Sequence, residues 1–365
     1  MTMGSKVAVV RFEKDVGNSL ERALKLLGKP DDINTIKRSV VIKVGVFDPN
    51  AENHTTVGVV DAIIKSFNKA PRIFLAESDN YRGKALERLQ LWKELFTDRV
   101  TPFSLSDDTR TKKLKLAGDE MRFSHILFKP NVLVSTHVLR GYERGSVLKN
   151  LFGLVPSPKK AKFHKKLDTL LADIYEAIGG VDLAVIDGTY LFGGFGAPLH
   201  AGEDTPEGRV RMNTLVVGRD AVAVDTVGAT LAGLKPEKMT VIQEFVKRGL
   251  GEGLLKNIEI VGASIESLKN KFMSVARTQK KQSARHRGPQ TWGGQAYHAF
   301  EELIRDGFFK ERNRRTLEVV IKTLETRGLP IEGKERKIVD ILARRTKSGV
   351  LKKCKTADGQ VYRTG

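Results

Sequence analysis

The segment Val134–His164 gathers many of the side chains that could bind an anion. Glycines and prolines interrupt it too often for a long helix or strand, while the apolar run VLKNLFGLV in its middle indicates an anchor in a core. Cationic and amide donors around glycines suit a phosphate or carboxylate ligand. A solvated basic loop is the alternative interpretation. The candidate side chains in this segment are His137, Arg140, Lys149, Asn150 and His164.

Ionisable residues also stand at the ends of apolar runs that read as strands. Lys43 lies in VVIKVG, Glu77 follows RIFLA, and Asp187 ends DLAVID. Open α/β sheets place their ligand crevices at the carboxyl ends of the strands, so we expect these side chains to meet there, with His54 at a strand–helix loop. An inward lysine would have a depressed pKa and could act as a base or anion ligand. A lysine reaching solvent from a strand end is the alternative.

Together these residues could perform acid–base chemistry on a phosphorylated or carboxylated small molecule. In this hypothesis His137 and Glu77 exchange protons while Lys149 holds the anionic group. The candidate catalytic residues are Lys43, His54, Glu77, His137 and Asp187.

A second candidate ligand loop, GTYLFGGFGAP, follows the apolar strand at Asp182–Asp187. No helix follows it, so it is not a dinucleotide fingerprint. Its glycines, Gly193, Gly194 and Gly196, would let backbone N–H groups approach an anion, and a tight structural turn is the alternative. Asp225 lies in the apolar run DAVAVDTVG, where a buried carboxylate requires a partner such as a site lysine or a cation.

Metal and cofactor motifs are few. The single cysteine, Cys354, excludes an iron–sulfur cluster and a Cys-rich zinc site, and the seven histidines show no zinc spacing. Asp187 and Glu77 could offer oxygen ligands to a divalent cation, although no motif indicates one.

Strands alternate with helices through the first three quarters of the chain. This alternation predicts a mainly parallel sheet with flanking helices in an α/β domain covering residues 1–275. Predicted strands are 6–11, 39–44, 72–76, 113–116, 123–127, 132–135, 182–187, 213–217 and 258–261, and predicted helices are 18–27, 56–67, 83–96, 165–178, 220–231, 236–248 and 264–272.

The net charge of the chain favours a polyanionic partner. The 365 residues carry a net charge of +20, which favours DNA, RNA or anionic small molecules. No apolar run approaches the roughly 20 residues of a membrane span, and the first residues are charged too early for a secretory signal. We therefore expect a cytoplasmic protein without a membrane partner.

The C-terminal quarter has a different pattern. Residues 277–365 hold 22 Lys/Arg and 10 Asp/Glu, more than half of the net charge. Residues 276–295 read as a basic linker. Helices at 299–306, 315–327 and 333–345, followed by strands at 350–355 and 360–363 around an Asp-Gly turn, predict a winged helix over residues 296–365.

This predicted module would bind nucleic acid through phosphate contacts. Its third helix is the natural recognition helix, and a solvated charged helix or a protein-docking wing is the alternative. The candidate contacts are Arg312, Arg314, Arg315, Lys334, Arg336, Lys337, Arg344, Arg345, Lys352, Lys353 and Arg363. DNA, RNA and the ribosome are all possible partners.

Several segments resemble the family called domain of unknown function 362 (DUF362). They are Lys43 with HTTVGVVDAI, Glu77 in FLAESD, STHVLRGYERGSVLKNLFGLVPSPKKAKFH, VIDGTYLFGGFGAP and MNTLVVGRDAVAVDTVGATLAGL. The resemblance covers about residues 5–262 and implies a fold, since the family has no settled activity. Two departures are Ser135-Thr136-His137, where relatives read Lys-Thr-His, and Lys43-Val44-Gly45, where they often read Lys-Pro-Asn. The C-terminal segment resembles archaeal winged-helix modules.

Two functional hypotheses follow. In the first, the C-terminal module binds nucleic acid and the α/β domain holds an anionic ligand in its crevice. In the second, the crevice is the active site of an acid–base enzyme. The counted charge asymmetry favours the first.

Overall fold

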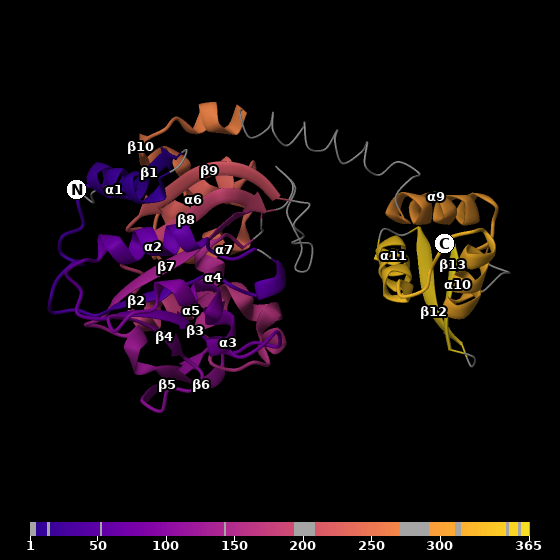
Figure 1. Cartoon of the computed structure of the whole chain (residues 1–365), viewed down its shortest axis with the longest axis horizontal. Helices are drawn as coiled ribbons and strands as arrows, with labels where there is room; N and C mark the ends of the chain where they lie inside the picture. Colours follow the sequence, from indigo (N-terminus) through magenta and orange to yellow (C-terminus); the bar gives the residue numbers. More distant parts are fainter. Residues whose placement is uncertain are drawn as a thin grey trace. The chain divides into compact units, whose positions relative to one another are not determined.

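The computed structural model describes residues 5–12, 15–51, 53–141, 144–192, 209–270, 292–310, 315–347, 350–356 and 359–364. The chain forms two compact units, Met1–Ala276 and Arg277–Gly365 (Figure 1). The first unit has two hydrophobic cores and the second unit has one.

The first unit is organised around one eight-stranded sheet, in the order β10-β1-β9-β8-β7-β2-β3-β4. β9 runs antiparallel to β1 and β8, and the other neighbours pair in parallel. The predicted mainly parallel sheet is therefore confirmed. The strands are β1 Lys6–Arg11, β2 Val40–Lys43, β3 Ile73–Glu77, β4 Val100–Ser104, β7 Val132–Arg140, β8 Leu183–Phe192, β9 Arg209–Gly218 and β10 Glu259–Gly262.

Helices cover both faces of this sheet, and alternate strand residues enter the two cores. Val40 and Ile42 pack into one core, and Val41 between them packs into the other, as expected for a strand whose side chains alternate between faces. The first core contains residues of α1 Val16–Leu26, α2 Val57–Ser66 and α3 Ala85–Leu89. The second contains residues of α4 Val147–Asn150, α5 Leu167–Ile178, α6 Ala221–Leu231 and α7 Thr240–Lys247.

The predicted helix 83–96 is broken. α3 ends at Leu89 and a 3-10 helix, Gln90–Leu95, follows with a kink at Trp92. Trp92 is fully buried, and its indole N–H donates to the Thr55 carbonyl at 3.1 Å. The next strand, β4, was not predicted, because Pro102 interrupts the pattern of strand-forming residues. β4 is an edge strand, where a proline need not remove a hydrogen bond between strands.

Two strands next to the site run further than predicted. β7 continues past Ser135 to Arg140, and β8 continues past Asp187 to Phe192. The start of the predicted glycine loop, residues 188–192, is therefore strand. Gly188 permits this because a Cβ there would lie 2.3 Å from the Thr214 carbonyl oxygen. Gly193, Gly194 and Gly196 lie outside the described residues.

A small antiparallel hairpin, β5 Thr111–Leu116 and β6 Asp119–Ser124, stands apart from the main sheet. Its strands cover the two short strands predicted in this region, although residues 125–127 form a 3-10 helix. Residues 265–270 are helical, in agreement with the predicted helix 264–272.

The second unit contains α9 Trp292–Arg305, β11 Arg315–Thr316, α10 Leu317–Thr326, α11 Glu335–Lys347, β12 Leu351–Thr356 and β13 Gly359–Thr364. Its antiparallel sheet has the order β11-β13-β12. The predicted three helices and hairpin are present. α9 begins at Trp292, inside the predicted linker, because Phe300 and Leu303 share its apolar face with Ala296 in the core.

Among the described residues, every helix is too short or too polar to traverse a lipid bilayer.

Candidate functional site

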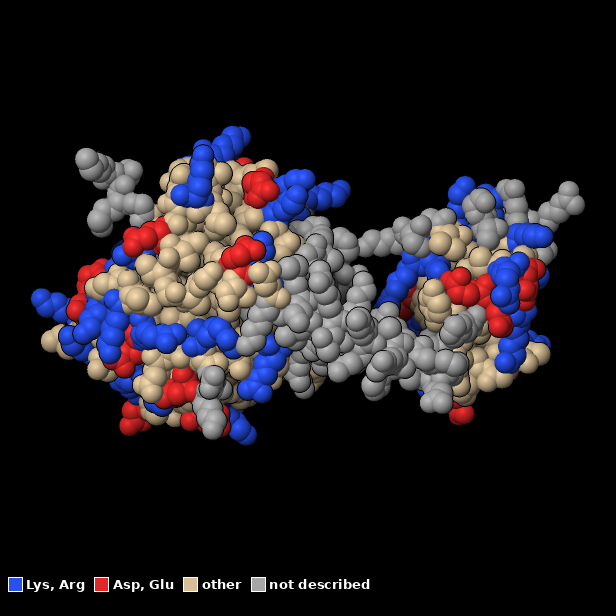
Figure 2. Space-filling view, turned by 90° about the horizontal axis from the view of Figure 1, so that it is seen from above, with Lys and Arg blue, Asp and Glu red and all other residues tan. Residues whose placement is uncertain are grey.

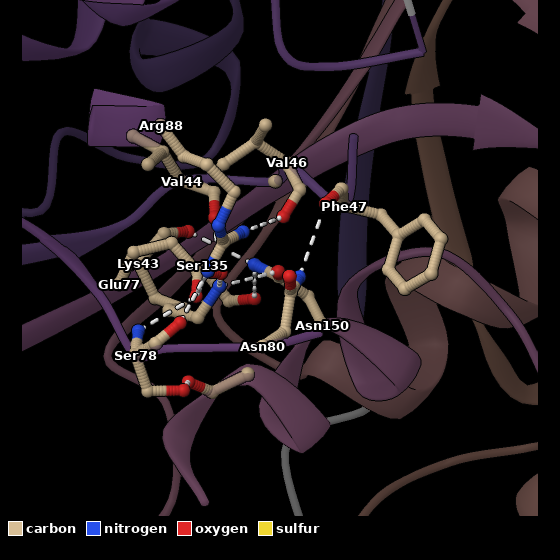
Figure 3. Close-up of polar contacts among 12 residues, drawn as sticks. Lys43, Val44, Val46, Phe47, Glu77, Ser78, Asn80, Arg88, Ser135 and Asn150 are labelled. Atoms are coloured by element: carbon tan, nitrogen blue, oxygen red, sulfur yellow. Dashed lines mark hydrogen bonds and ion pairs between the residues drawn. The ribbon is translucent and has the colours of Figure 1, made fainter. Parts of the chain in front are cut away.

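The site is built around a buried ion pair at the carboxyl ends of two adjacent parallel strands. Lys43 ends β2 and Glu77 ends β3, and their side chains are 1% and 3% exposed. The Lys43 ammonium pairs with Glu77 Oε1 and donates to the Val44 carbonyl at 2.8 Å and to Asn150 Oδ1 at 2.9 Å (Figure 3). Lys43 therefore faces inward, as one of the two interpretations of its strand predicted.

Arg88 forms a second ion pair with Glu77. The guanidinium lies 2.9 Å from Glu77 Oε2, which also accepts from the Ser78 N–H at 2.6 Å. Burial alone would raise the pKa of Glu77, but the charges of Lys43 and Arg88 hold it below its ordinary value. Burial also lowers the pKa of Lys43, partly offset by Glu77. A carboxylate held ionised in this way argues against the predicted proton exchange between Glu77 and His137.

Asn150 links this ion pair to the segment after β7. Its amide nitrogen donates to the Lys43 carbonyl at 2.9 Å, the Thr136 carbonyl at 3.1 Å and Ser135 Oγ at 3.2 Å. The amide offers both donor and acceptor atoms at once, which a carboxylate or an aliphatic side chain cannot do. Asn150 thus fixes α4 against β2 and β7.

Above the ion pair lies a cavity of about 240 Å³, here called the crevice. Cationic and histidine side chains dominate its polar lining, and Glu77 is its one carboxylate among the described residues. The polar lining residues are Glu77, Asn80, His137, Arg140, Lys149, Asn150, Lys160 and His164, and Phe47, Tyr81 and Phe152 supply aromatic surface.

Two lysines in the crevice have lowered pKa values. Lys149 makes no ion pair with a described residue, and its ammonium lies 4.3 Å from the centre of the Phe152 ring. Burial, followed by repulsion from Arg140, lowers the pKa of Lys149 to about 7. Lys160 donates to Ser78 Oγ at 2.6 Å, and burial lowers its pKa to about 8 although Glu77 acts in the opposite direction. A bound anion would relieve both penalties.

His137 presents a neutral ring to the crevice. Its Nδ1 accepts from the Val138 N–H at 2.8 Å, so the proton of the neutral ring lies on Nε2. Burial, followed by the charges of Arg140 and Lys43, holds the pKa of His137 well below its usual value. The ring packs on Gly45, where a Cβ would lie 2.4 Å from it. His137 is thus placed as a hydrogen-bond donor.

Asp225 positions the start of the segment that carries Lys149. Its carboxylate accepts from the backbone N–H groups of Ser146, Val147 and Leu148 at 2.9, 3.1 and 2.8 Å. Burial raises the pKa of Asp225 to about 6 against these three bonds. Gly145 has a φ of +74°, and a Cβ there would lie 2.3 Å from Asp225 Oδ2. The partners of this buried carboxylate are therefore the backbone N–H groups at the start of α4, whereas the sequence suggested a lysine or a cation as its partner.

Asp187 and His54 do not line the crevice. Asp187 accepts from the Thr56 N–H at 2.7 Å and from the Thr189 N–H at 2.9 Å, and so holds the start of α2. His54 packs edge-on against Trp92 at 5.8 Å between ring centres. Of the predicted set, the structure brings together Lys43, Glu77, His137, Arg140, Lys149, Asn150 and His164.

Sequence reasoning missed several residues of the site. Phe47 and Tyr81 lie in the loops just after β2 and β3, so the rule that found Lys43 and Glu77 could have found them too. Lys160 could have been selected as a cation of the same segment. Arg88 gave no such signal, because an arginine in a predicted helix normally faces solvent.

Other hollows of the first unit contain cations that are paired with carboxylates beside them. In a hollow of about 650 Å³ beside α1 and α2, Lys25 pairs with Glu21 at 2.7 Å and Lys65 pairs with Asp61 at 2.6 Å. In another of about 390 Å³, Arg144 pairs with Asp168 at 3.0 Å. Within the part of the chain that the structure describes, His, Cys, Asp and Glu form no group of three suited to a metal ion.

The predicted nucleic-acid contacts of the second unit fall into two groups. Arg336, Arg344, Lys352 and Lys353 are exposed and form no ion pair with described residues. Arg363 is half-buried on β13. On the face seen in Figure 2, acidic side chains lie among the cations of this unit.

The remaining predicted contacts are engaged within the unit or lie outside the description. Lys334 and Lys337 lie over the Trp292 ring at 5.5 and 5.7 Å, and Arg315 lies over Phe308 at 4.5 Å. Arg345 forms an ion pair with Glu301. Arg312 and Arg314 lie outside the described residues.

The central part of the chain matches the model of a protein family. The model of the family described as "Domain of unknown function (DUF362)" matches residues 40–230. This range contains every residue named above for the crevice and the two positioning carboxylates. No curated protein matches the chain. The chain belongs to the DUF362 family.

Proposed function

We propose that the crevice binds a small anionic molecule by its phosphate or carboxylate group. The observation that carries this proposal is Lys149, a half-buried lysine without an ion-pair partner among the described residues, next to Lys160 in one cavity. The carboxylate of that cavity, Glu77, is already neutralised by Lys43 and Arg88. Burying cations together costs free energy unless an anion joins them, so the cavity has the charge of a ligand site.

The surroundings support the same conclusion. The crevice lies beyond the carboxyl ends of β2, β3 and β7, where open α/β sheets bind their ligands. Its polar groups include the Nε2–H of His137 and the amide of Asn80, which can donate to oxygen atoms. The hydrogen bonds of Asn150 and Asp225 hold the segment that carries Lys149 in place without a bound ligand.

The test is ligand-dependent thermal stability of the full chain. A ligand that binds only the folded state raises the melting temperature, so phosphate and citrate should raise it relative to chloride at equal ionic strength. The increase should be lost in Lys149→Met and retained in Lys65→Met. Equal melting temperatures in all three salts would refute the proposal.

Acid–base catalysis on the same anion is the second candidate. The specific observation in its favour is the pKa of Lys149, about 7, since a general base works best near the operating pH. This version moves the base from the predicted His137 and Glu77 to Lys149. Turnover of a phosphorylated or carboxylated compound that is abolished in Lys149→Arg would support it; a bound ligand recovered unchanged would not.

We also propose that Arg277–Gly365 is a winged-helix module that binds DNA or RNA. The support is the order helix, short strand, two helices and hairpin, together with exposed Arg336 and Arg344 on α11 and Lys352 and Lys353 on β12. In this arrangement α11 would enter a groove and the hairpin would flank it. A cytoplasmic location is part of this proposal.

Binding of the full chain to duplex DNA, duplex RNA and ribosomes tests this module. Each phosphate contact contributes about −0.9 to the slope of log K against log salt on B-DNA. The slope should therefore be several units, and a slope near zero would exclude phosphate contacts.

A further inference from the structure

Two aromatic side chains stand exposed at the mouth of the crevice. Phe47 is 38% exposed and Tyr81 is 71% exposed, and they are the exposed aromatic side chains among the described residues of the first unit. Their rings meet edge-to-face, with centres 5.3 Å apart and planes at 72°. In Figure 3 the Phe47 ring points away from the polar network around Lys43. Both residues line the same cavity as Lys149 and Lys160.

The loops that present these rings are tied to each other. Asn80 donates from its side chain to the Phe47 carbonyl at 3.0 Å and forms two backbone bonds with Gly83. Its side-chain oxygen accepts from the Arg82 N–H at 2.7 Å. Arg82 in turn lies 3.5 Å from Asp48 Oδ2 and 5.1 Å from the centre of the Tyr81 ring. Such a network holds the two rings in place without burying them.

Large exposed apolar groups beside a polar cavity mark binding surfaces. Aromatic rings attract other flat rings in edge-to-face or offset-stacked arrangements, beyond the effect of the area they bury. The mouth of the crevice therefore offers a place for a flat ring, while its interior offers several cations. Two of these cations, Lys149 and Lys160, form no ion pair with described residues, and their two charges match the double charge of a phosphomonoester.

We infer that the crevice binds a phosphomonoester joined to a flat ring system, namely a nucleoside monophosphate. Its phosphate lies beside Lys149 and Lys160, and its base stacks on Tyr81 or Phe47. This inference rests on the anion-binding function proposed above and names its ligand class.

Calorimetric titration of the full chain with AMP, ribose 5-phosphate and adenosine separates the two parts of the ligand. AMP should bind at least about tenfold more tightly than ribose 5-phosphate, because a base stacked on an aromatic side chain typically contributes about that factor or more. Tyr81→Ala or Phe47→Ala, whichever removes the ring that carries the base, should reduce the difference to about twofold or less by weakening the binding of AMP. Tyr81→Phe, which retains the ring, should preserve the difference. Tyr297→Ala, a matched exposed tyrosine in the second unit, should not change it.

The results of these titrations test the ring site separately from the anion site proposed above. Equal affinity for AMP and ribose 5-phosphate in the unmodified chain would exclude the ring site and leave anion binding in place. An AMP advantage that survives in both Tyr81→Ala and Phe47→Ala would place the base elsewhere and also overturn the inference. Ribose 5-phosphate affinity that is absent, or unaffected by Lys149→Met, would overturn the anion site and the ring site together.

Discussion

Lys43 and Asn150 form reciprocal hydrogen bonds. The Lys43 ammonium donates to Asn150 Oδ1 at 2.9 Å, and the Asn150 amide donates to the Lys43 carbonyl at 2.9 Å. This pair joins β2 to the segment that carries Lys149. The residues that these two segments contribute to the crevice are therefore fixed relative to each other. Both side chains are buried.

Asn150→Ala should therefore lower the free energy of unfolding by about 2–4 kcal/mol, because it leaves buried polar groups of Lys43 and Thr136 without partners. Urea denaturation measures this change. Asn68→Ala is the control, since Asn68 makes one exposed bond to Asn34, and its effect should stay within about 0.5 kcal/mol. Similar values for the two variants would contradict the positioning role of Asn150.

Glu77→Gln should be more costly. Removing this carboxylate leaves the charges of Lys43 and Arg88 buried together, and breaking a buried ion pair on one side typically costs about 3–5 kcal/mol. Guanidinium chloride denaturation should show this loss, whereas Glu87→Gln on exposed α3 surface should change stability by less than about 1 kcal/mol. A Glu77→Gln protein as stable as the parent would show that Glu77 does not neutralise the two cations.

Asp225→Asn tests the cap at the start of α4. The new amide group would direct a donor at backbone N–H groups that now bond to the carboxylate, so we expect a loss of about 2–4 kcal/mol and weaker anion binding. Thr226→Val is the matched control on the same helix. The Thr226 hydroxyl is buried and has no hydrogen-bond partner among the described residues, so its replacement should be neutral or stabilising by up to about 1 kcal/mol. Thermal unfolding of both variants distinguishes the two roles.

Anion binding should weaken as the pH rises. The pKa of Lys149 is lowered to about 7 and that of Lys160 to about 8, so both amines lose their protons above these values and must regain them to hold an anion. Between pH 7.5 and 9.5, where a phosphomonoester with a pKa near 6 stays a dianion, affinity should fall by up to about tenfold per pH unit for each proton taken up. Lys149→Arg, which stays charged, should show a shallower fall. An affinity independent of pH in this window would contradict the proposal.

Nucleic-acid binding should depend on the exposed cations of the second unit. Arg336→Ala together with Arg344→Ala should reduce the salt slope by about 1–2 if both contact phosphates. The control is Arg345→Ala, because Arg345 already pairs with Glu301, and it should change the slope less. Filter-binding isotherms at several salt concentrations measure all three slopes. An unchanged slope in the double variant would remove α11 from the interface.

The sequence predicted those parts of the site that follow from strand periodicity. Lys43 and Glu77 end apolar runs, and parallel pairing of β2 with β3 brings such ends to one edge. The apolar anchor VLKNLFGLV likewise indicated a fixed segment, and Leu148 and Leu151 are fully buried.

What the sequence could not predict depends on contacts between distant segments. From the sequence, Asp225 is a possible ligand residue. In the structure α6 lies beside α4, and the Asp225 carboxylate accepts hydrogen bonds from three backbone N–H groups there. Arg88 reads as a surface residue until its helix is packed beside Glu77. Asp187 reads as a strand end because Gly188 usually terminates a strand, yet here β8 continues against β9.

The most direct test of the account is the affinity of ribose 5-phosphate for the full chain at pH 7.5, measured by calorimetry with Lys149→Met and Lys65→Met. Lys149→Met should fold at least as well as the parent, because it removes a cation that neighbouring cations repel and that forms no ion pair with a described residue. We expect saturable binding to the parent chain and to Lys65→Met, and binding weakened at least about tenfold in Lys149→Met because a charge-assisted bond is lost. Binding of equal strength in all three proteins, or no binding to the parent chain at millimolar ligand, would contradict it.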